Sequence, residues 1–171
     1  FSNTKLVTSC AVLLLLEDGR IELDEPVEHH IPQLARRRVL RPGARTLDDT
    51  EPARGPITIR HLLCHSSGLS YGLFDPGSIA FKAYQERKVL NPMTMLADMV
   101  DQLAELPLVY HPGTSLEYSV ATDVVGRLVE VVSGEALDKF IERRIFAPLG
   151  MVDTAFAVPE LIAQGIDPRS I

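Results

Sequence analysis

The chain has 171 residues, of which 46% are hydrophobic and 23% are charged, a composition typical of one soluble globular domain. The formal net charge of −6 argues against a nucleic-acid partner, because binding to phosphates requires a basic face. The longest apolar run, residues 10–16, is too short to cross a bilayer, so no transmembrane segment is predicted.

The first predicted element is a helix from Thr4 to Glu17, which stops at Gly19. Apolar side chains occupy nearly every face of this helix, so we expect other parts of the protein to cover it on all sides. Cys10 lies in this helix and Cys64 lies in a second apolar segment, and both are predicted to be buried thiols.

The middle of the chain begins with an irregular stretch. Residues 36–56 are rich in Arg, Asp, Pro and Gly, and we expect a loop excursion there. The basic cluster at 35–45 is followed directly by acidic residues, which favours a solvated loop over a binding patch. A short helix is then predicted to start after Thr58 and to stop before Ser67.

Helical patterns dominate the second half. One helix is expected over about 75–88, and an amphipathic helix is expected after Thr94, which would cap it. The cleanest 3.6-residue period starts at Ala121 and is closed by Gly134, and Pro148 ends one more helix.

Strand signals are sparse. Residues 20–23 and 154–158 alternate between apolar and polar side chains, but neither stretch could form a sheet alone. The chain is therefore predicted to be mostly helical.

Ser2 and Lys5 are three residues apart, which places them on the same face of the first helical turn. The backbone N–H of a serine at a helix start lies at the positive end of the helix dipole and could stabilise an oxyanion. A lysine one turn deeper could take or polarise the hydroxyl proton. The pattern alone nevertheless favours a structural interpretation, since serine caps helices routinely.

Three further stretches carry a family resemblance: "ITIRHLLCHSSGL" at 57–69, "HPGTSLEYSVATDVVGRLVEVVSG" at 111–134 and "IFAPLGMVDT" at 145–154. With the S-x-x-K pair, they resemble the serine β-lactamase and penicillin-binding-protein superfamily, in order and over nearly the whole chain. Within it, the sequence is most similar to class C β-lactamases and to the family VIII carboxylesterases built on that scaffold.

The resemblance implies a role for three residues. Ser2 matches the acylated serine and Lys5 the lysine of S-x-x-K, while Tyr118 in "EYSV" matches the tyrosine of the Tyr-x-Asn motif. The phenol would act as general base toward Ser2 or water and as acid toward the leaving group. Without the resemblance, Tyr118 would be an ordinary loop aromatic before a helix.

The sequence departs from the family pattern in two ways that bear on the substrate. Tyr-x-Asn has become Tyr118-Ser119-Val120, so the amide that helps to hold a β-lactam side chain is missing, as is common in family VIII esterases. The excursion at 36–56 resembles the extra loop of those esterases. Both departures favour simple carboxylic esters.

The implied fold is the α+β fold of β-lactamases and transpeptidases. Residues 1–171 would form a partial domain that covers mainly the helical region and lacks most of the antiparallel sheet. The N-terminal strands and the C-terminal sheet segment, with its Lys-Thr-Gly or Trp-Gly-Gly triplet, are expected to lie outside the chain. With the natural N-terminus also expected to be missing, the compartment stays open between cytoplasm, periplasm and secretion, and so does the oligomeric state.

The implied function is a serine hydrolase that cleaves small carboxylic esters through an acyl-enzyme intermediate, without metal or organic cofactor. A β-lactamase or a D-alanyl-D-alanine carboxypeptidase using the same residues is one alternative. A non-catalytic binding relative, or an inactive fragment, is another.

Two remaining sets of polar residues receive structural interpretations. His61 and His65 are four residues apart, but no third ligand is evident and no metal site is predicted. Asp123 and Glu130 are expected on the solvated face of their helix.

Overall fold

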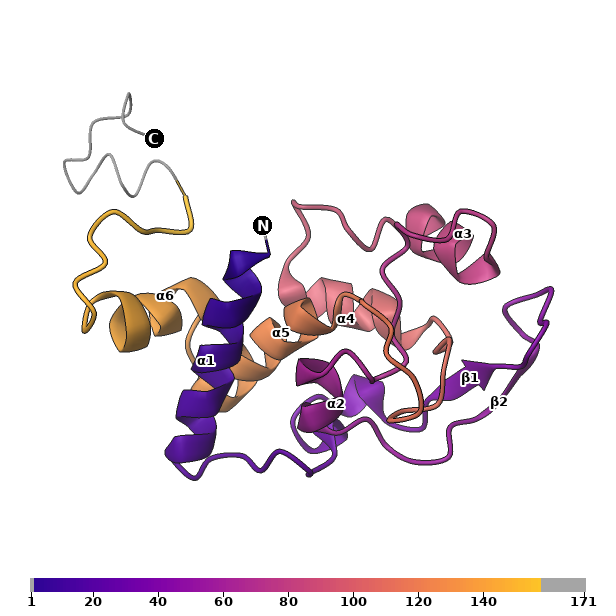
Figure 1. Cartoon of the computed structure of the whole chain (residues 1–171), viewed down its shortest axis with the longest axis horizontal. Helices are drawn as coiled ribbons and strands as arrows, with labels where there is room; N and C mark the ends of the chain where they lie inside the picture. Colours follow the sequence, from indigo (N-terminus) through magenta and orange to yellow (C-terminus); the bar gives the residue numbers. More distant parts are fainter. Residues whose placement is uncertain (1, 158–171) are drawn as a thin grey trace.

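The computed structural model describes residues 2–157. Its α-helices are, in chain order, α1 (Asn3–Glu17), α2 (Ile59–Leu63), α3 (Ile79–Glu86), α4 (Leu96–Ala104), α5 (Ala121–Ser133) and α6 (Leu137–Ile141). The shorter elements are the 3-10 turns η1 (Val27–His29) and η2 (Pro32–Leu34), the strands β1 (Arg38–Leu40) and β2 (Thr50–Pro52), and the π-helical turn η3 (Glu142–Phe146). The molecule is elongated, with α1 and α6 toward one end, α5 in the middle, and the hairpin and α3 at the other end (Figure 1).

Helix α5 is the centre of the core and packs against α1, α2, α4 and α6. The side chains of Val124, Val125 and Leu128 are buried, as the 3.6-residue period predicts, whereas Val131 of the same period is 39% exposed. Gly134 ends the helix in the left-handed conformation, with φ of +76°. This prediction of the helix and of its end is confirmed.

The end of α1 is also as predicted. Gly19 has φ of +69°, and its N–H donates to the carbonyl oxygen of Leu16 at 3.0 Å. The N–H of Arg20 reaches back to the oxygen of Leu15, also at 3.0 Å. These two bonds form a Schellman motif, which satisfies carbonyls that the helix itself leaves unpaired.

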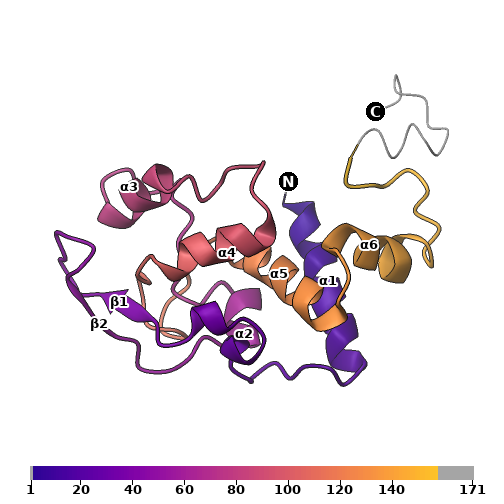
Figure 2. The same cartoon turned by 180° about the vertical axis from the view of Figure 1, so that it is seen from behind.

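Residues 2–157 cover α1 on one side only; the expected cover of its other side would come from the larger sheet that these residues lack. Ala11, Val12 and Leu15 are fully buried, whereas Leu6 is 69% exposed and Leu13 is 47% exposed. Figures 1 and 2 show α1 in front of α5 in one view and behind it in the opposite view, so α5 covers one face only.

The predicted burial of the two thiols is wrong, because Cys10 and Cys64 are both exposed. Cys10 lies between Leu6 and Leu13 on the uncovered face of α1. Cys64 is the residue directly after the short helix α2, at its C-cap position.

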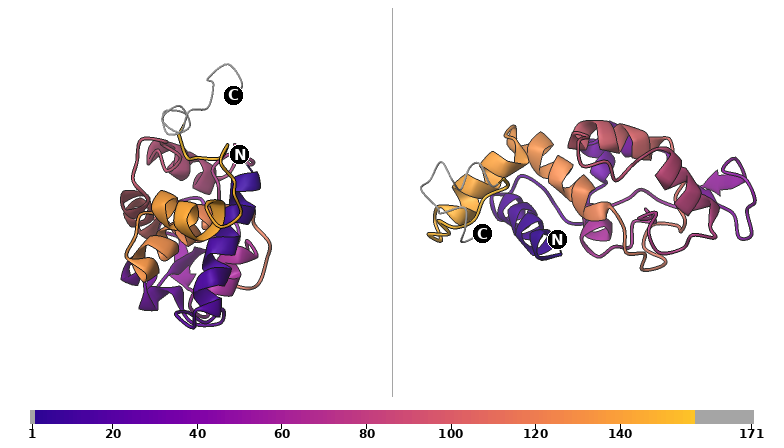
Figure 3. Two further views of the ribbon diagram at one scale, coloured as in Figure 1. Left: turned by 90° about the vertical axis from the view of Figure 1, so that its left-hand side faces the viewer. Right: turned by 90° about the horizontal axis from the view of Figure 1, so that it is seen from above.

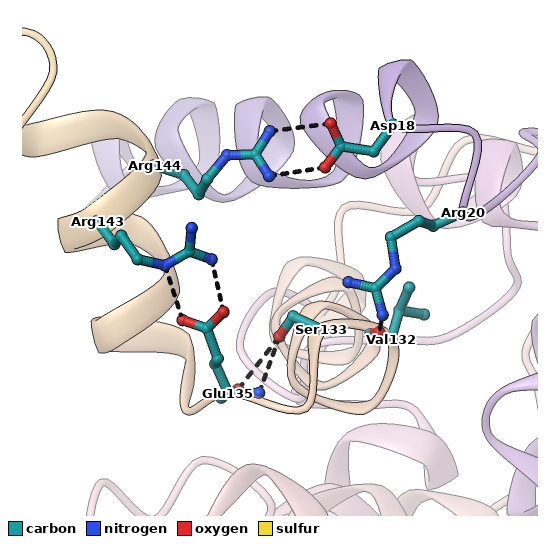
Figure 4. Close-up of polar contacts among 7 residues, drawn as sticks. All are labelled: Asp18, Arg20, Val132, Ser133, Glu135, Arg143 and Arg144. Carbon is teal, nitrogen blue, oxygen red and sulfur yellow. Dashed lines mark hydrogen bonds and ion pairs between the residues drawn. The ribbon is translucent and has the colours of Figure 1, made fainter.

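Ion pairs join the C-terminal end of α1 to the α6–η3 segment (Figure 4). The guanidinium of Arg144 donates two hydrogen bonds to the carboxylate of Asp18, at 2.7 and 3.1 Å. Arg143 pairs in the same two-pronged way with Glu135, and Arg20 donates to the carbonyl oxygen of Val132. The Arg144–Asp18 pair thus joins the end of α1 to η3, the Arg20 contact joins the chain after α1 to α5, and the Arg143–Glu135 pair joins η3 to the turn between α5 and α6.

The predicted start of α2 is confirmed, whereas α4 starts one residue later than predicted. Thr58 caps α2 through a capping box with His61. Helix α4 begins at Leu96 with Met95 at its N-cap position, and no side chain caps it. Thr94, the predicted cap, lies one residue before the N-cap position, and its N–H bonds to the Asn91 carbonyl in the preceding turn.

The strands lie inside the stretch for which an irregular loop was expected. β1 and β2 form an antiparallel pair in which Val39 faces Glu51. Seen from above, in the right-hand view of Figure 3, this hairpin lies at the far end of the molecule from α6. Residues 20–23 form no strand, because Leu23 instead accepts a hydrogen bond from the N–H of Arg60 in α2. Residues 154–157 form no strand either, and residue 158 lies outside the described part of the chain.

The hairpin is joined to the rest of the molecule on both sides of β1. Leu108 exchanges backbone hydrogen bonds with Arg38 and Leu40, each at 2.8 Å. Arg37, just before β1, is buried and donates from its guanidinium to three carbonyls at the end of α4, among them that of Leu103 at 2.8 Å. The described part of the chain is thus mostly helical with one small sheet, and it holds no helix long and apolar enough to span a bilayer.

Candidate active site

Ser2 stands at the N-cap position of α1, but its hydroxyl makes no capping hydrogen bond. The structural interpretation of this serine, that of a helix cap, is therefore not what the structure shows. The N–H of Lys5 donates to the carbonyl oxygen of Ser2 at 3.2 Å, and the lysine side chain is partly buried on the same turn. The hydroxyl is left available for another partner.

That partner comes from the loop before α5. Tyr118 is 36% exposed, and its ring centroid lies 5.1 Å from Nζ of Lys5. A hydrogen bond with Lys5, and then one with Ser2, lowers the pKa of the Tyr118 phenol. The same contact with Tyr118 raises the pKa of Lys5. The packing of α1 on α5 therefore brings all three expected site residues together.

An aromatic cluster surrounds the Tyr118 ring. The rings of His65, Tyr71 and Phe74 have centroids 4.8, 5.6 and 5.9 Å from it. Tyr71 and Phe74 stack on each other at 5.8 Å. Sequence reasoning missed this cluster, since no periodic pattern or motif spacing relates residues 65–74 to a tyrosine more than forty positions later.

Hydrogen bonds from the 65–70 turn fix the backbone on both sides of the tyrosine. The N–H of Glu117 donates to the His65 carbonyl at 2.8 Å, and the N–H of Ser119 donates to Nδ1 of the same histidine at 3.2 Å. The N–H of Val120 donates to the carbonyl of Ser70 at 3.3 Å. The Ser70 hydroxyl also donates to the Glu117 carboxylate, so the tyrosine loop is held along its length.

The residue that replaces the family's asparagine has a structural role here. Val120 is fully buried at the N-cap position of α5. An apolar side chain packed into the core cannot offer a hydrogen bond to a ligand. This position therefore supplies no polar group to the site.

Asp123 is not on a solvated face, which corrects the expectation for this residue. Its carboxyl is largely buried in the first turn of α5, and burial raises the pKa of Asp123. The charge of Lys5 acts in the opposite direction. Asp123 and the Tyr118 phenol are therefore both acidic groups that act on Lys5.

The turn at residues 65–70, which bonds to the loop that carries Tyr118, depends on Gly68. This residue has φ of +83°, and a Cβ placed on it would lie 2.0 Å from the carbonyl oxygen of Tyr110. We expect Gly68→Ala to lower the free energy of unfolding by about 2–5 kcal/mol, because it combines a left-handed backbone with a clash against backbone that must move. Urea unfolding would measure the loss.

Gly134→Ala is the matched control. Gly134 has a similar φ of +76°, but a Cβ there would meet nothing within 4 Å. Gly134→Ala should therefore lower the free energy of unfolding only through the left-handed backbone conformation, by about 1–2 kcal/mol. Equal losses for the two variants would show that the close approach to Tyr110 does not constrain the turn.

A cavity of about 560 Å³ opens beside the aromatic cluster. Its walls come from the hairpin, from the 70–81 segment and from the loop that leads to the tyrosine. Tyr71 and Phe74 line it at the end nearest Tyr118, and Arg54 and Glu51 of the hairpin side contribute charge. The stretch expected to be a loop excursion thus forms a wall of the cavity next to the candidate site.

The two histidines of the 57–69 segment take part in separate hydrogen bonds. Nδ1 of His61 accepts from the N–H of Thr58 at 3.2 Å, within the cap of α2. His65 faces Ser119 instead. The two rings are thus each engaged with a different part of the backbone.

Two esterases are among the known proteins to which the chain is similar. The chain is 40% identical over 158 residues to lovastatin esterase of Penicillium rubens, covering 91% of this chain and 38% of that protein. It is 36% identical over 169 residues to esterase EstB of Burkholderia gladioli, covering 95% of this chain and 39% of that protein. The chain thus spans well under half the length of these relatives.

A solved structure, that of EstCE1, described as a hydrolase with promiscuous acyltransferase activity, superposes with a TM-score of 0.71 at 29% identity. That match covers 85% of this chain and 36% of EstCE1. Together with a match to a penicillin-binding protein homologue from Pyrococcus abyssi, with a TM-score of 0.66 at 26% identity over 93% of this chain and 32% of that one, it places the chain in the β-lactamase and transpeptidase fold. The family model described as Beta-lactamase matches residues 1–165, nearly the whole sequence. The chain belongs to the Beta-lactamase family.

Proposed function

We propose that this chain is the helical part of a longer serine hydrolase that cleaves small carboxylic esters through an acyl-enzyme on Ser2. The observation that carries the proposal is the convergence of Ser2, Lys5 and Tyr118, with a serine hydroxyl that bonds to the tyrosine rather than capping its helix. A cap would direct the hydroxyl toward the backbone of α1, away from any substrate.

The directions of two pKa shifts support different roles for Lys5 and Tyr118 in proton transfer. The raised pKa of Lys5 keeps its amine protonated near neutral pH, so it cannot accept the Ser2 proton. The lowered pKa of Tyr118 favours its phenolate more than in a free tyrosine, with the Lys5 ammonium beside it, so Tyr118 is the better candidate for the base.

The reaction then has two stages. As Ser2 Oγ attacks the ester carbonyl, its proton moves to the Tyr118 oxygen, and the oxyanion accepts a hydrogen bond from the Ser2 N–H at the positive end of α1. The phenol returns the proton to the departing alcohol. A water molecule attacks the acyl-serine in the second stage, with Tyr118 again acting as base and Ser2 as the leaving group.

Three observations favour esters over β-lactams. The relatives with printed activities include lovastatin esterase and EstB, and EstCE1 is described as a hydrolase. The buried Val120 leaves no amide at the position where the family binds a β-lactam side chain. The cavity of about 560 Å³ beside Tyr118 has room for the acyl or alcohol part of an ester. We therefore propose that the protein is similar in function to the family VIII carboxylesterases.

The test uses a full-length version, meaning this sequence within a protein of the length of its relatives. p-Nitrophenyl butyrate and nitrocefin are compared side by side. Ester turnover with a kcat/KM far above that for nitrocefin supports the proposal. A preference for nitrocefin would favour a β-lactamase on the same residues, and turnover of neither would favour a non-catalytic relative.

A further inference from the structure

His65 lies against the proposed base but has no part in the mechanism above. It adopts the left-handed conformation, with φ of +53°, which is uncommon for a residue other than glycine. Its ring centroid lies 4.8 Å from that of Tyr118, and its Nδ1 lies 3.2 Å from the backbone nitrogen of Ser119. One residue in an unusual conformation thus contacts the tyrosine ring and the backbone next to it.

The hydrogen bond determines which ring nitrogen carries the proton. A backbone N–H can only donate, so Nδ1 accepts from Ser119 in this geometry, and the Ser119 hydroxyl, 3.3 Å away, can donate to the same nitrogen. The neutral ring then carries its proton on Nε2. Burial, and secondly the charge of Lys5, lowers the pKa of His65, which agrees with a neutral ring at this place.

The histidine also fixes the residue before the tyrosine. Its carbonyl oxygen accepts from the N–H of Glu117 at 2.8 Å. The backbone is therefore tied to His65 at positions 117 and 119, and the tyrosine between them has its ring packed on the imidazole. Ser119 is fully buried, so no water can replace the imidazole as acceptor for its N–H.

We propose that His65 is a positioning residue: its Nδ1–Ser119 hydrogen bond and its ring contact orient Tyr118, so that the phenol oxygen faces Ser2 and Lys5. This inference rests on the proposed function, because it assigns a role relative to the base of that reaction. A small displacement of a reacting group can cost about 10²-fold in rate, so the orientation should affect kcat more than KM.

Two substitutions in the full-length version separate positioning from simple packing. His65→Leu removes the acceptor, and kcat should fall by about 10–100-fold with KM changed by less than about threefold. His65→Asn places an amide oxygen where Nδ1 lies and suits a positive φ, so kcat should stay within about fivefold of the unsubstituted protein. His29→Asn, at an exposed histidine, is the control and should have no effect.

A His65→Asn variant no more active than His65→Leu would overturn the inference, as would losses confined to KM. A ¹⁵N NMR measurement of the unsubstituted protein covers the case in which a variant does not fold. The inference predicts an Nε2-protonated His65 ring, and a proton on Nδ1 would contradict it.

Labelling of Ser2 by a fluorophosphonate probe separates this inference from the proposed function. If Ser2 of the unsubstituted protein is labelled but His65→Asn does not retain activity, only the role of His65 is wrong. If the probe leaves Ser2 unmodified, the proposed function and the role of His65 both fail.

Discussion

Ser2→Ala in the full-length version should abolish turnover of p-nitrophenyl butyrate, because the acyl group would have no oxygen to which it could bond. Lys5→Ala and Tyr118→Phe should each lower kcat by about 10²–10⁴-fold, the range of a lost general acid–base group. The phenol would lose its cation in the first case and its proton-transferring oxygen in the second. Steady-state kinetics on purified, folded variants provide the measurement.

The double variant distinguishes a catalytic unit from three independent contributions. Lys5 raises the acidity of Tyr118 and Tyr118 holds the Lys5 ammonium, so removing both should be scarcely worse than removing either. Multiplicative losses would mean that the two side chains act separately. Near-normal turnover by Ser2→Ala would place the nucleophile elsewhere.

Residues 1–171 expressed alone should be inactive and should unfold without a sharp transition. Leu6, Cys10 and Leu13 form an uncovered apolar face on α1, and each forfeits about 25 cal/mol per Å² of apolar surface left in water. Such a patch favours self-association. The sheet segment that the family resemblance implies outside these residues would also be missing, and if that segment supplies one oxyanion donor, its loss costs about 3–4 kcal/mol in transition-state stabilisation. Ester hydrolysis and thermal unfolding of the isolated chain measure both effects.

The paired substitution Leu6→Glu and Leu13→Glu sharpens this test. In the isolated chain, the two carboxylates should raise solubility, because both positions face water. In the full-length version the same pair should destabilise the protein, since a covering sheet would bury the charges. A soluble, cooperatively unfolding and active chain of 171 residues would contradict the interpretation that it is part of a larger fold.

Helices with a strong local signal could be predicted from the sequence. The period of α5 and the glycines after α1 and α5 act through neighbouring residues, and Gly19 and Gly134 adopt the left-handed conformation that the predictions require. Ser2, Lys5 and Tyr118 were selected by resemblance to the family rather than by periodicity. The structure brings these three side chains together, while their roles stay predictions.

Features that depend on long-range contacts could not be predicted. The strands at 38–40 and 50–52 form because β1 also bonds to Leu108, far away in the sequence. Asp123 occurs in the period of an ordinary polar face, and only the packing of α5 buries its carboxyl. In the sequence His65 is only the end of a short helix, because its partner Ser119 is more than fifty positions away.

The most direct test of the central claim is to identify the acylated residue. The full-length version is mixed with p-nitrophenyl butyrate and quenched in acid, and its peptides are analysed by mass spectrometry. The account predicts a butyryl group on the peptide that contains Ser2, localised to that hydroxyl and absent in Ser2→Ala. A butyryl group on another residue, or ester turnover that never acylates Ser2, would contradict it.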